Sequence, residues 1–254
     1  MANLFDPSTV VEGIPELLPY LPLTLEIVFI SAFFALLLGF AIAIVEIKEI
    51  PILKQGAAVY VSYMRGTPLL VQLYIAYYGI PLSLEYFNYQ FQTNISIDNV
   101  SNLIFVILAF SLNEAAYASE TIRAALLAVD KGQVEAGESI GLTSFQVFWH
   151  IVLPESLKIA IPSLGNIFIG LLKGTSLAFV CAVVEMTAAS KLIAGRNLRF
   201  FEMYISLSLI YWGLSILSAK VFVYIEKRLR RSENVLKTDE QLLKSLNTAV
   251  AKNG

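Results

Sequence analysis

Charged side chains are scarce in this chain. Only 15% of its 254 residues are Asp, Glu, Lys or Arg, whereas 57% are hydrophobic, and the mean hydropathy is +0.69. An ordinary soluble domain carries about 25% charged residues, so the shortage excludes a typical water-soluble protein. The composition predicts a chain that has the lipid bilayer as its solvent.

Cysteine and histidine are also almost missing, with Cys181 and His150 the single examples. One cysteine excludes an internal disulfide, and Cys181 lies in an apolar stretch that predicts a packing role. A lone histidine without partner ligands predicts no metal site. The net charge is -2 and no basic patch with interleaved aromatics occurs, so no nucleic-acid partner is expected.

The chain is instead rich in long apolar runs without charged residues. A helix needs about 20 such residues to cross about 30 Å of hydrocarbon. We expect an all-α membrane protein with about five spans, anchored on residues 27–45, 67–84, 99–113, 159–184 and 203–219. The third span is extended to about residue 122, because a run ending at Asn113 is too short to cross.

Basic residues predict which side of the membrane each end occupies. They gather between the first two spans, between the third and fourth, and after the fifth, at Lys48, Lys54, Arg123, Lys131, Lys158, Lys227, Arg228, Arg230 and Arg231. The positive-inside tendency makes these segments cytoplasmic and the topology N-out/C-in, although Lys191, Arg196 and Arg199 then fall outside. We expect an extracytoplasmic segment at residues 1–20 that is not a cleaved signal peptide, since it lacks Lys and Arg. A transmembrane domain at residues 21–226 and a cytoplasmic polar tail at residues 227–254, helical or frayed, complete the chain.

The loop at residues 130–154 carries strong local signals. Asp130 and Thr143 are each followed three residues later by glutamine, the spacing of a capping box. Gly141 lies between them, where glycine readily adopts a left-handed cap, and Pro154 is expected to end the second helix. The loop is therefore predicted to form a helix, a turn and a second helix at the membrane surface. Its apolar residues, among them Phe145 and Trp149, either meet a partner or fold back onto the membrane or the chain.

The same loop carries a recognisable motif. It reads Glu135-Ala136-Gly137, then Gly141, and after nine more residues Ile151-Val152-Leu153-Pro154. This resembles the EAA loop of ABC-importer permeases, through which a membrane subunit is coupled to an ATPase. The resemblance implies coupling roles for Glu135, Ala136, Gly137, Gly141, Ile151, Leu153 and Pro154. Gly137 replaces a second alanine, which affects only local helix stability, by roughly 1 kcal/mol. We call residues 130–154 the coupling loop.

The resemblance extends over nearly all of residues 20–226 and is to the polar-amino-acid branch of these permeases. It is carried by residues 22–25, 65–72, 116–123, 162–166 and 173–177. It implies a type I ABC-importer permease fold in a multi-pass protein of the bacterial plasma (inner) membrane. It also implies three protein partners, namely an ATPase dimer in the cytoplasm, a second permease subunit, identical or paralogous, and an extracytoplasmic amino-acid-binding protein. No GxxxxGK[ST] motif occurs, so ATP and Mg²⁺ are expected on the ATPase chain, and no cofactor or catalytic residue on this one.

Ionisable residues within spans cost roughly 2.5 to 3.5 kcal/mol each at the bilayer centre, so they suggest function. Glu114 and Lys173 fall near mid-depth, where they could bind the ammonium and carboxylate groups of an amino acid. The alternative is that they pair with each other, as Arg65 and Glu120 would do nearer the cytoplasm. Tyr117 shares a helix face with Glu120 and is a further candidate for the substrate pathway, as is Arg65.

Two segments echo each other. Residues 65–69 and 173–177 share the order cation, Gly, Thr, any residue, Leu. Thr67 before Pro68 reads as an N-cap, so a helix is predicted to begin there after a break. Broken backbone at membrane depth is tolerated only against protein or a wet cavity, which makes Thr175 and Ser176 candidate pathway residues unless the echo is coincidental. Glu185 is expected near the outer face, either facing substrate or binding protein or as a solvated rim carboxylate.

The substrate class is the least constrained property. Residues 173–186 and 87–91 look most like the cystine-importing members of the branch. Gly174 stands where the branch often has Asp, which makes a strongly cationic substrate less natural. Histidine, glutamine and arginine remain alternatives. A different function, an ATP-independent amino-acid channel or facilitator, would use the same midplane charges but would have no need of the coupling loop.

Overall fold

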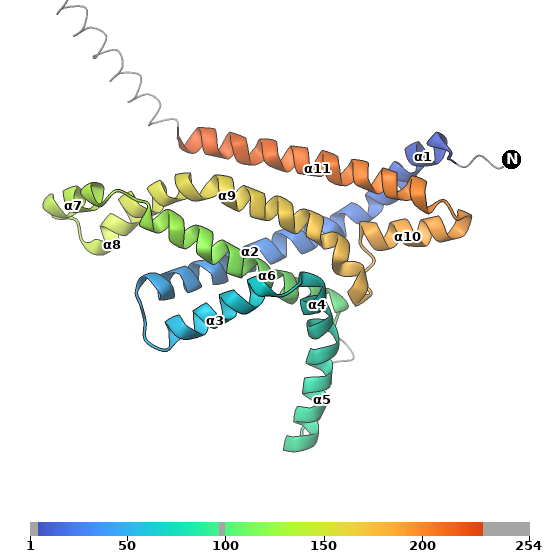
Figure 1. The fold of residues 1–254 in the computed structure, drawn as a ribbon, viewed down its shortest axis with the longest axis horizontal. Coiled ribbons are helices and arrows are strands. Elements are labelled where there is room, and N and C mark those ends of the chain that lie inside the picture. Colours follow the sequence, from blue (N-terminus) through green and yellow to red (C-terminus); the bar gives the residue numbers. More distant parts are fainter. Residues whose placement is uncertain (1–4, 97–99, 231–254) are drawn as a thin grey trace, which may run out of the picture.

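The computed structural model describes residues 5–96 and 100–230, and every regular element in them is helical (Figure 1). The α-helices are α1 (Pro7–Leu17), α2 (Leu21–Ile47), α3 (Leu53–Gly66), α4 (Leu69–Tyr74), α5 (Ile80–Phe91), α6 (Asn102–Leu127), α7 (Lys131–Ser139), α8 (Ser144–Val147), α9 (Leu153–Gly174), α10 (Met186–Asn197) and α11 (Phe200–Leu229). Short 3-10 segments η1 (Leu18–Tyr20) and η4 (Thr175–Cys181) and π segments η2 (Ile75–Gly79) and η3 (Phe148–Val152) join some of them. The predicted all-α class is confirmed.

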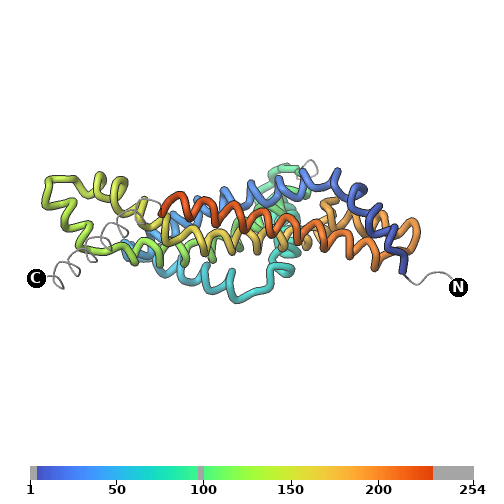
Figure 2. Tube along the Cα trace, turned by 90° about the horizontal axis from the view of Figure 1, so that it is seen from above, coloured from blue at the N-terminus to red at the C-terminus, as the bar shows by residue number. Residues whose placement is uncertain are grey.

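Within the described residues, 4 helical stretches are long and apolar enough to cross a membrane. They are Pro7–Ile47, Asn102–Leu127, Ser144–Cys181 and Phe200–Leu229. They contain the predicted spans 27–45 and 203–219 and most of the spans predicted from residue 99 and at 159–184, but not residues 67–84. Helices α2, α6, α9 and α11 run along the long axis of the molecule (Figures 1 and 2).

Small side chains let α2 and α6 approach closely. Buried small residues recur at every fourth position of α2, at Ser31, Ala35, Gly39 and Ala43. A Cβ atom on Gly39 would lie 3.0 Å from the carbonyl oxygen of Ala115 and 3.0 Å from the Cβ of Ala118. Such stripes are typical of membrane helix pairs, in which backbone proximity replaces the hydrophobic effect as the driving force. Ala115 and Ala118 are thus close-packing positions of α6.

Residues 67–84 do not form the single straight span that the hydropathy predicts. Helix α3 lies against α2 and α6, ends at Gly66, and is followed by α4, η2 and α5. Pro68 has no amide hydrogen to donate, and Thr67 is extended, with φ -118° and ψ 146°. The chain therefore breaks there, and α5 leaves the bundle at a steep angle (Figure 1). Thr67 closes α3, and α4 begins only at Leu69, so the predicted helix start is displaced by one residue.

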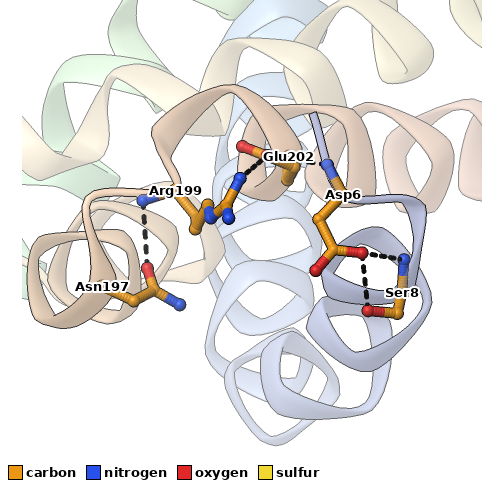
Figure 3. Close-up of polar contacts among 5 residues, drawn as sticks. All are labelled: Asp6, Ser8, Asn197, Arg199 and Glu202. Atoms are coloured by element: carbon orange, nitrogen blue, oxygen red, sulfur yellow. Dashed lines mark hydrogen bonds and ion pairs between the residues drawn. The ribbon is translucent and has the colours of Figure 1, made fainter. Parts of the chain in front are cut away.

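The N-terminal helix packs on the last helix of the bundle. The backbone N–H of Asp6 donates to Oε1 of Glu202 over 3.2 Å, and Arg199 reaches the same oxygen at 2.9 Å (Figure 3). Deeper in, the hydroxyl of Ser206 donates to the carbonyl oxygen of Val10 over 2.8 Å. The boundary predicted at residue 20 falls inside the helical stretch Pro7–Ile47. The predicted tail starts inside α11, and residues 231–254 lie outside the described residues.

Candidate functional site

The coupling loop folds as two helices joined at Gly141. Asp130 caps α7 by accepting from the N–H of Gly132 over 2.7 Å, a simple cap in place of the predicted box. Thr143 and Gln146 form the predicted capping box in full, with the N–H of Thr143 donating to Gln146 over 2.9 Å. Gly141 has φ +86°, a conformation that glycine adopts without steric cost. Both predicted helix starts and the glycine turn are therefore confirmed.

Pro154 does not end the second helix, contrary to prediction. Helix α8 continues through the π segment η3 into α9, whose first turn contains Pro154. Pro154 lies directly after the π segment, so it marks a change of helix type and not the end of the helix. Consequently α8, η3 and α9 form one stretch, Ser144–Cys181, and the coupling loop is mechanically continuous with a membrane helix.

Close packing of the two arms of the coupling loop centres on Gly137. This residue is buried, and an added Cβ atom would lie 2.6 Å from Cδ1 of Ile151 and 3.3 Å from Cγ2 of Val147. The absence of a side chain thus lets α7 lie directly on η3. Gly137 was predicted to affect local helix stability alone, and the structure adds this contact.

An exposed apolar surface covers the tip of the coupling loop. Ile140 is 79% exposed, Phe145 71% and Trp149 51%, and the rings of Phe145 and Trp149 are 5.9 Å apart. Glu135 and Ala136 are also exposed, on the neighbouring helix α7. These apolar side chains do not fold back onto the described part of the chain, so they are available to a partner surface.

Two amide side chains hold the break after α3, and neither was predicted to do so. Nε2 of Gln72 donates to the carbonyl oxygens of Met64 and Thr67 over 3.0 and 3.2 Å and contacts Thr67 Oγ1 at 2.7 Å. Nδ2 of Asn113 donates to Oε1 of Gln72 over 2.9 Å and to the carbonyl oxygen of Met64 over 3.2 Å. Gln72 and Asn113 are both buried. The sequence did carry a signal for this role, since neutral amides within apolar runs need hydrogen-bond partners in a membrane.

The two similar segments, residues 65–69 and 173–177, also have similar structures. Gly66 is the last residue of α3 and Gly174 the last of α9, with Arg65 and Lys173 in the respective last turns. The hydroxyl of Thr67 donates back to Tyr63 over 2.8 Å, and that of Thr175 to Leu172 over 2.7 Å, each to a carbonyl oxygen. A cation is favourable at a helix C-terminus. Segments α4 and η4, which follow the two breaks, contact each other.

Arg65 and Glu120 form an ion pair, as one of the hypotheses expected. Nη1 of Arg65 lies 3.5 Å from Oε1 of Glu120, and the guanidinium Cζ lies 5.5 Å from the centroid of the Tyr117 ring. Nearby, Nε of Arg123 lies 3.6 Å from Oε2 of Glu46. Tyr117 is exposed beside them.

Glu114 and Lys173 are not brought together. Among the described residues no ion pair joins them, so the hypothesis that they pair is wrong for this conformation. Glu114 lines a small apolar pocket with residues of α2, α9 and α11, including Phe168 and Phe222. Lys173 is exposed at the end of α9, and Ser176 is partly buried in η4.

Glu185 is fully buried, so its interpretation as a solvated rim carboxylate is wrong. Its side chain caps α10 by accepting from the N–H groups of Thr187 and Ala188 over 2.8 and 3.0 Å. The hydroxyl of Tyr211 on α11 lies 3.3 Å from Oε2 of Glu185 and 3.2 Å from Oγ1 of Thr175. Burial raises the pKa of Glu185, and the hydrogen bonds from the two amides oppose that rise. The carboxylate thus joins η4, α10 and α11.

The chain is similar in sequence and in structure to known proteins. Residues 35–231 match the family model described as binding-protein-dependent transport system inner membrane component. The probable amino-acid permease protein YxeN of Bacillus subtilis (strain 168) is 40% identical over 215 residues, which cover 85% of this chain and 92% of that protein. The L-cystine transport system permease protein TcyL of the same organism is 38% identical over 238 residues, or 94% of this chain and 97% of that protein. A crystal structure of an amino acid ABC transporter with histidines has a TM-score of 0.73 and 32% identity, covering 88% of this chain and 99% of that chain.

Proposed function

This chain belongs to the family of binding-protein-dependent transport system inner membrane components, and from that premise we propose that it is the membrane-spanning subunit of an ATP-driven amino-acid ABC importer. It supplies the translocation pathway in the plasma membrane and has no enzymatic role. The observation that carries the proposal is the coupling loop, in which a capped helical hairpin with an exposed apolar tip continues directly into a membrane helix. An ATP-independent channel or facilitator would not need this element.

The proposed ATPase partner binds the tip of the coupling loop. Ile140, Phe145 and Trp149 form the apolar part of the contact, and exposed Glu135 lies on the adjacent helix. Because α8, η3 and α9 are continuous, a displacement of the tip is passed to the membrane bundle without an intervening flexible linker. ATP and Mg²⁺ are bound by that ATPase. A second permease subunit and an extracytoplasmic amino-acid-binding protein complete the proposed assembly.

The proposed substrate is L-cystine or another polar amino acid. The resemblance to TcyL, which is named as an L-cystine permease, supports this choice. The surroundings of Gly174 support it further, because an added Cβ atom there would lie 3.3 Å from Cε1 of Phe110 and 3.7 Å from Cδ2 of Leu69. The position offers apolar contacts and no carboxylate, which suits a substrate without a strongly cationic side chain.

The proposed pathway passes the two helix breaks. Lys173, exposed at the second break, is the group proposed to face the substrate carboxylate, with the partly buried Ser176 beyond it. Thr175 is fully buried and bonded to Leu172 and Tyr211, so its proposed role is to hold η4 in place. Glu114 keeps its proposed role toward the ammonium only if it leaves the apolar pocket that it now lines. Glu185 acts by holding η4 and α10 in place, because its carboxylate is enclosed.

Reconstitution in liposomes with the ATPase and binding protein, followed by uptake measurements on a panel of amino acids, tests this function. Ala136→Pro places a proline inside α7, where it removes a backbone hydrogen bond. We expect ATP hydrolysis to continue while uptake is lost, and Glu135→Ala to show a partial form of the same defect. Ala136→Ser, which keeps the helix, is the matched control. Full ligand-dependent uptake by the Ala136→Pro variant would contradict the coupling role.

A further inference from the structure

A polar hollow lies between the end of α2, one face of α3 and the second half of α6. Its volume is about 680 Å³, within the range of roughly 300–1,000 Å³ typical of small-ligand pockets. It is lined by Glu46, Ala58, Val61, Ser62, Arg65, Gly66, Tyr117 and Glu120. Two other large hollows are lined mainly by apolar side chains. The polar hollow begins below the first break and lies along the part of α6 that leads to the coupling loop.

The charged groups of this hollow are only loosely paired. Arg65 and Glu120 are 3.5 Å apart, and Arg123 and Glu46 are 3.6 Å apart. Fully formed charge-assisted hydrogen bonds measure about 2.7–2.9 Å. The exposed pair Lys54–Glu49 and the partly buried pair Lys158–Glu155 in the same chain reach 2.7 and 2.6 Å. The hollow therefore keeps donors and acceptors that an incoming ligand can use.

Structural stabilisation is a weak explanation for these residues. The side chains of Arg65 and Glu120 are 46% and 43% exposed, and exposed ion pairs contribute little to stability. Meanwhile the Tyr117 ring lies against the Arg65 guanidinium, which restricts its orientation. A fixed guanidinium with free donors is suited to a planar carboxylate.

We propose that this hollow is an inner binding site for the backbone groups of the transported amino acid. Arg65 donates to the α-carboxylate, and Glu120 accepts from the α-ammonium, so that the substrate inserts into the open ion pair. Glu46, 13% exposed and 3.6 Å from Arg123, supplies a second acidic group near the ammonium. The inference rests on the proposed function and adds a site distinct from Lys173.

The charge balance favours a zwitterion over a simple ion. Two basic and two acidic side chains meet here, counting Arg123 with Glu46. A zwitterion replaces one ion pair by two without leaving an uncompensated charge, whereas a cation or an anion would leave one. Besides Tyr117, the remaining lining is small and uncharged, namely Ala58, Val61, Ser62 and Gly66. The site therefore recognises the groups that all amino acids share, and side-chain selectivity arises elsewhere.

The test uses the whole transporter in liposomes with the binding protein outside and amino acid loaded inside. We expect the internal amino acid to slow ATP-driven import of labelled substrate. Its N-acetyl derivative lacks the ammonium and its methyl ester lacks the carboxylate, so neither should inhibit at the same concentration. Glu120→Gln and Arg65→Lys should each raise the half-inhibiting concentration about tenfold, equivalent to about 1.4 kcal/mol.

Glu226→Gln is the matched control, because it removes an ion pair with Arg230 on α11, away from the hollow. It should leave the inhibition unchanged. Equal inhibition by the charge-deleted analogues, or import unaffected by internal amino acid, would overturn the inner site while leaving the importer function intact. Since the analogue series uses the unmodified chain, it decides the question even if a variant fails to assemble. Absence of uptake for every amino acid of the panel would instead overturn the proposed function.

Discussion

The hydrogen bonds at the first helix break make Gln72 the most sharply testable structural residue. Gln72→Leu preserves approximate volume and apolar packing but removes every bond to the side-chain amide. The carbonyl oxygen of Met64 would still accept a hydrogen bond from Nδ2 of Asn113 over 3.2 Å. The carbonyl oxygen of Thr67 would lose its Gln72 donor, and Asn113 would lose the acceptor Oε1. A buried polar group without a partner costs about 1–3 kcal/mol, so the two losses amount to at most about 2–6 kcal/mol.

The assay is the thermal unfolding midpoint of the purified transporter, measured at one fixed scan rate because membrane complexes commonly unfold irreversibly. Gln55→Leu, at an exposed position of α3, is the matched control. A cycle with Asn113→Leu adds a second criterion, since the double variant should cost less than the sum of the single ones. If Gln72→Leu is no more destabilising than Gln55→Leu, or if the two costs simply add, the account of the break is wrong.

Further predictions concern the coupling loop and the buried carboxylate. Gly137→Ala should reduce uptake per ATP hydrolysed, because the added Cβ atom would lie only 2.6 Å from Cδ1 of Ile151 and force that side chain to move. Adding Ile151→Val, which removes Cδ1, should restore the uptake. The packing argument is refuted if Gly137→Ala has no effect or if Ile151→Val does not restore uptake. Thr143→Ala should destabilise the hairpin by about 1 kcal/mol through loss of the cap, seen as faster amide hydrogen exchange in α8. Burial raises the pKa of Glu185, so the native state binds its proton more tightly and stability should fall as pH rises above the usual glutamate range. Glu185→Gln should flatten that fall in unfolding midpoints taken across pH, and an unchanged slope would count against it.

Local rules were enough to predict several parts of the molecule. Apolar run length located four of the membrane stretches, since crossing hydrocarbon imposes a minimum length. Cap spacing located both helix starts of the coupling loop, because Asp130 and Thr143 act on amides only two or three residues away. The pairing of Arg65 with Glu120 followed from the cost of unpaired charge near the membrane.

Other parts depended on contacts between distant segments and were not accessible from sequence. Whether Pro154 ends a helix or begins one depends on η3, which packs against α7. Glu185 could not be placed without Tyr211, which lies 26 positions further along the chain. Gln72 and Asn113 were visible as polar residues, but their separation of 41 positions concealed their common role.

The position of the one cysteine has a practical consequence for measuring transport. Cys181 is fully buried in η4, with its Sγ 3.7 Å from the carbonyl oxygen of Leu73 in α4. The chain has no other thiol, so in this conformation a maleimide probe meets no accessible target. A thiol engineered at an exposed position would then be labelled alone. Conversely, alkylation of Cys181 during turnover would record the moment at which η4 separates from α4, in the unmodified protein.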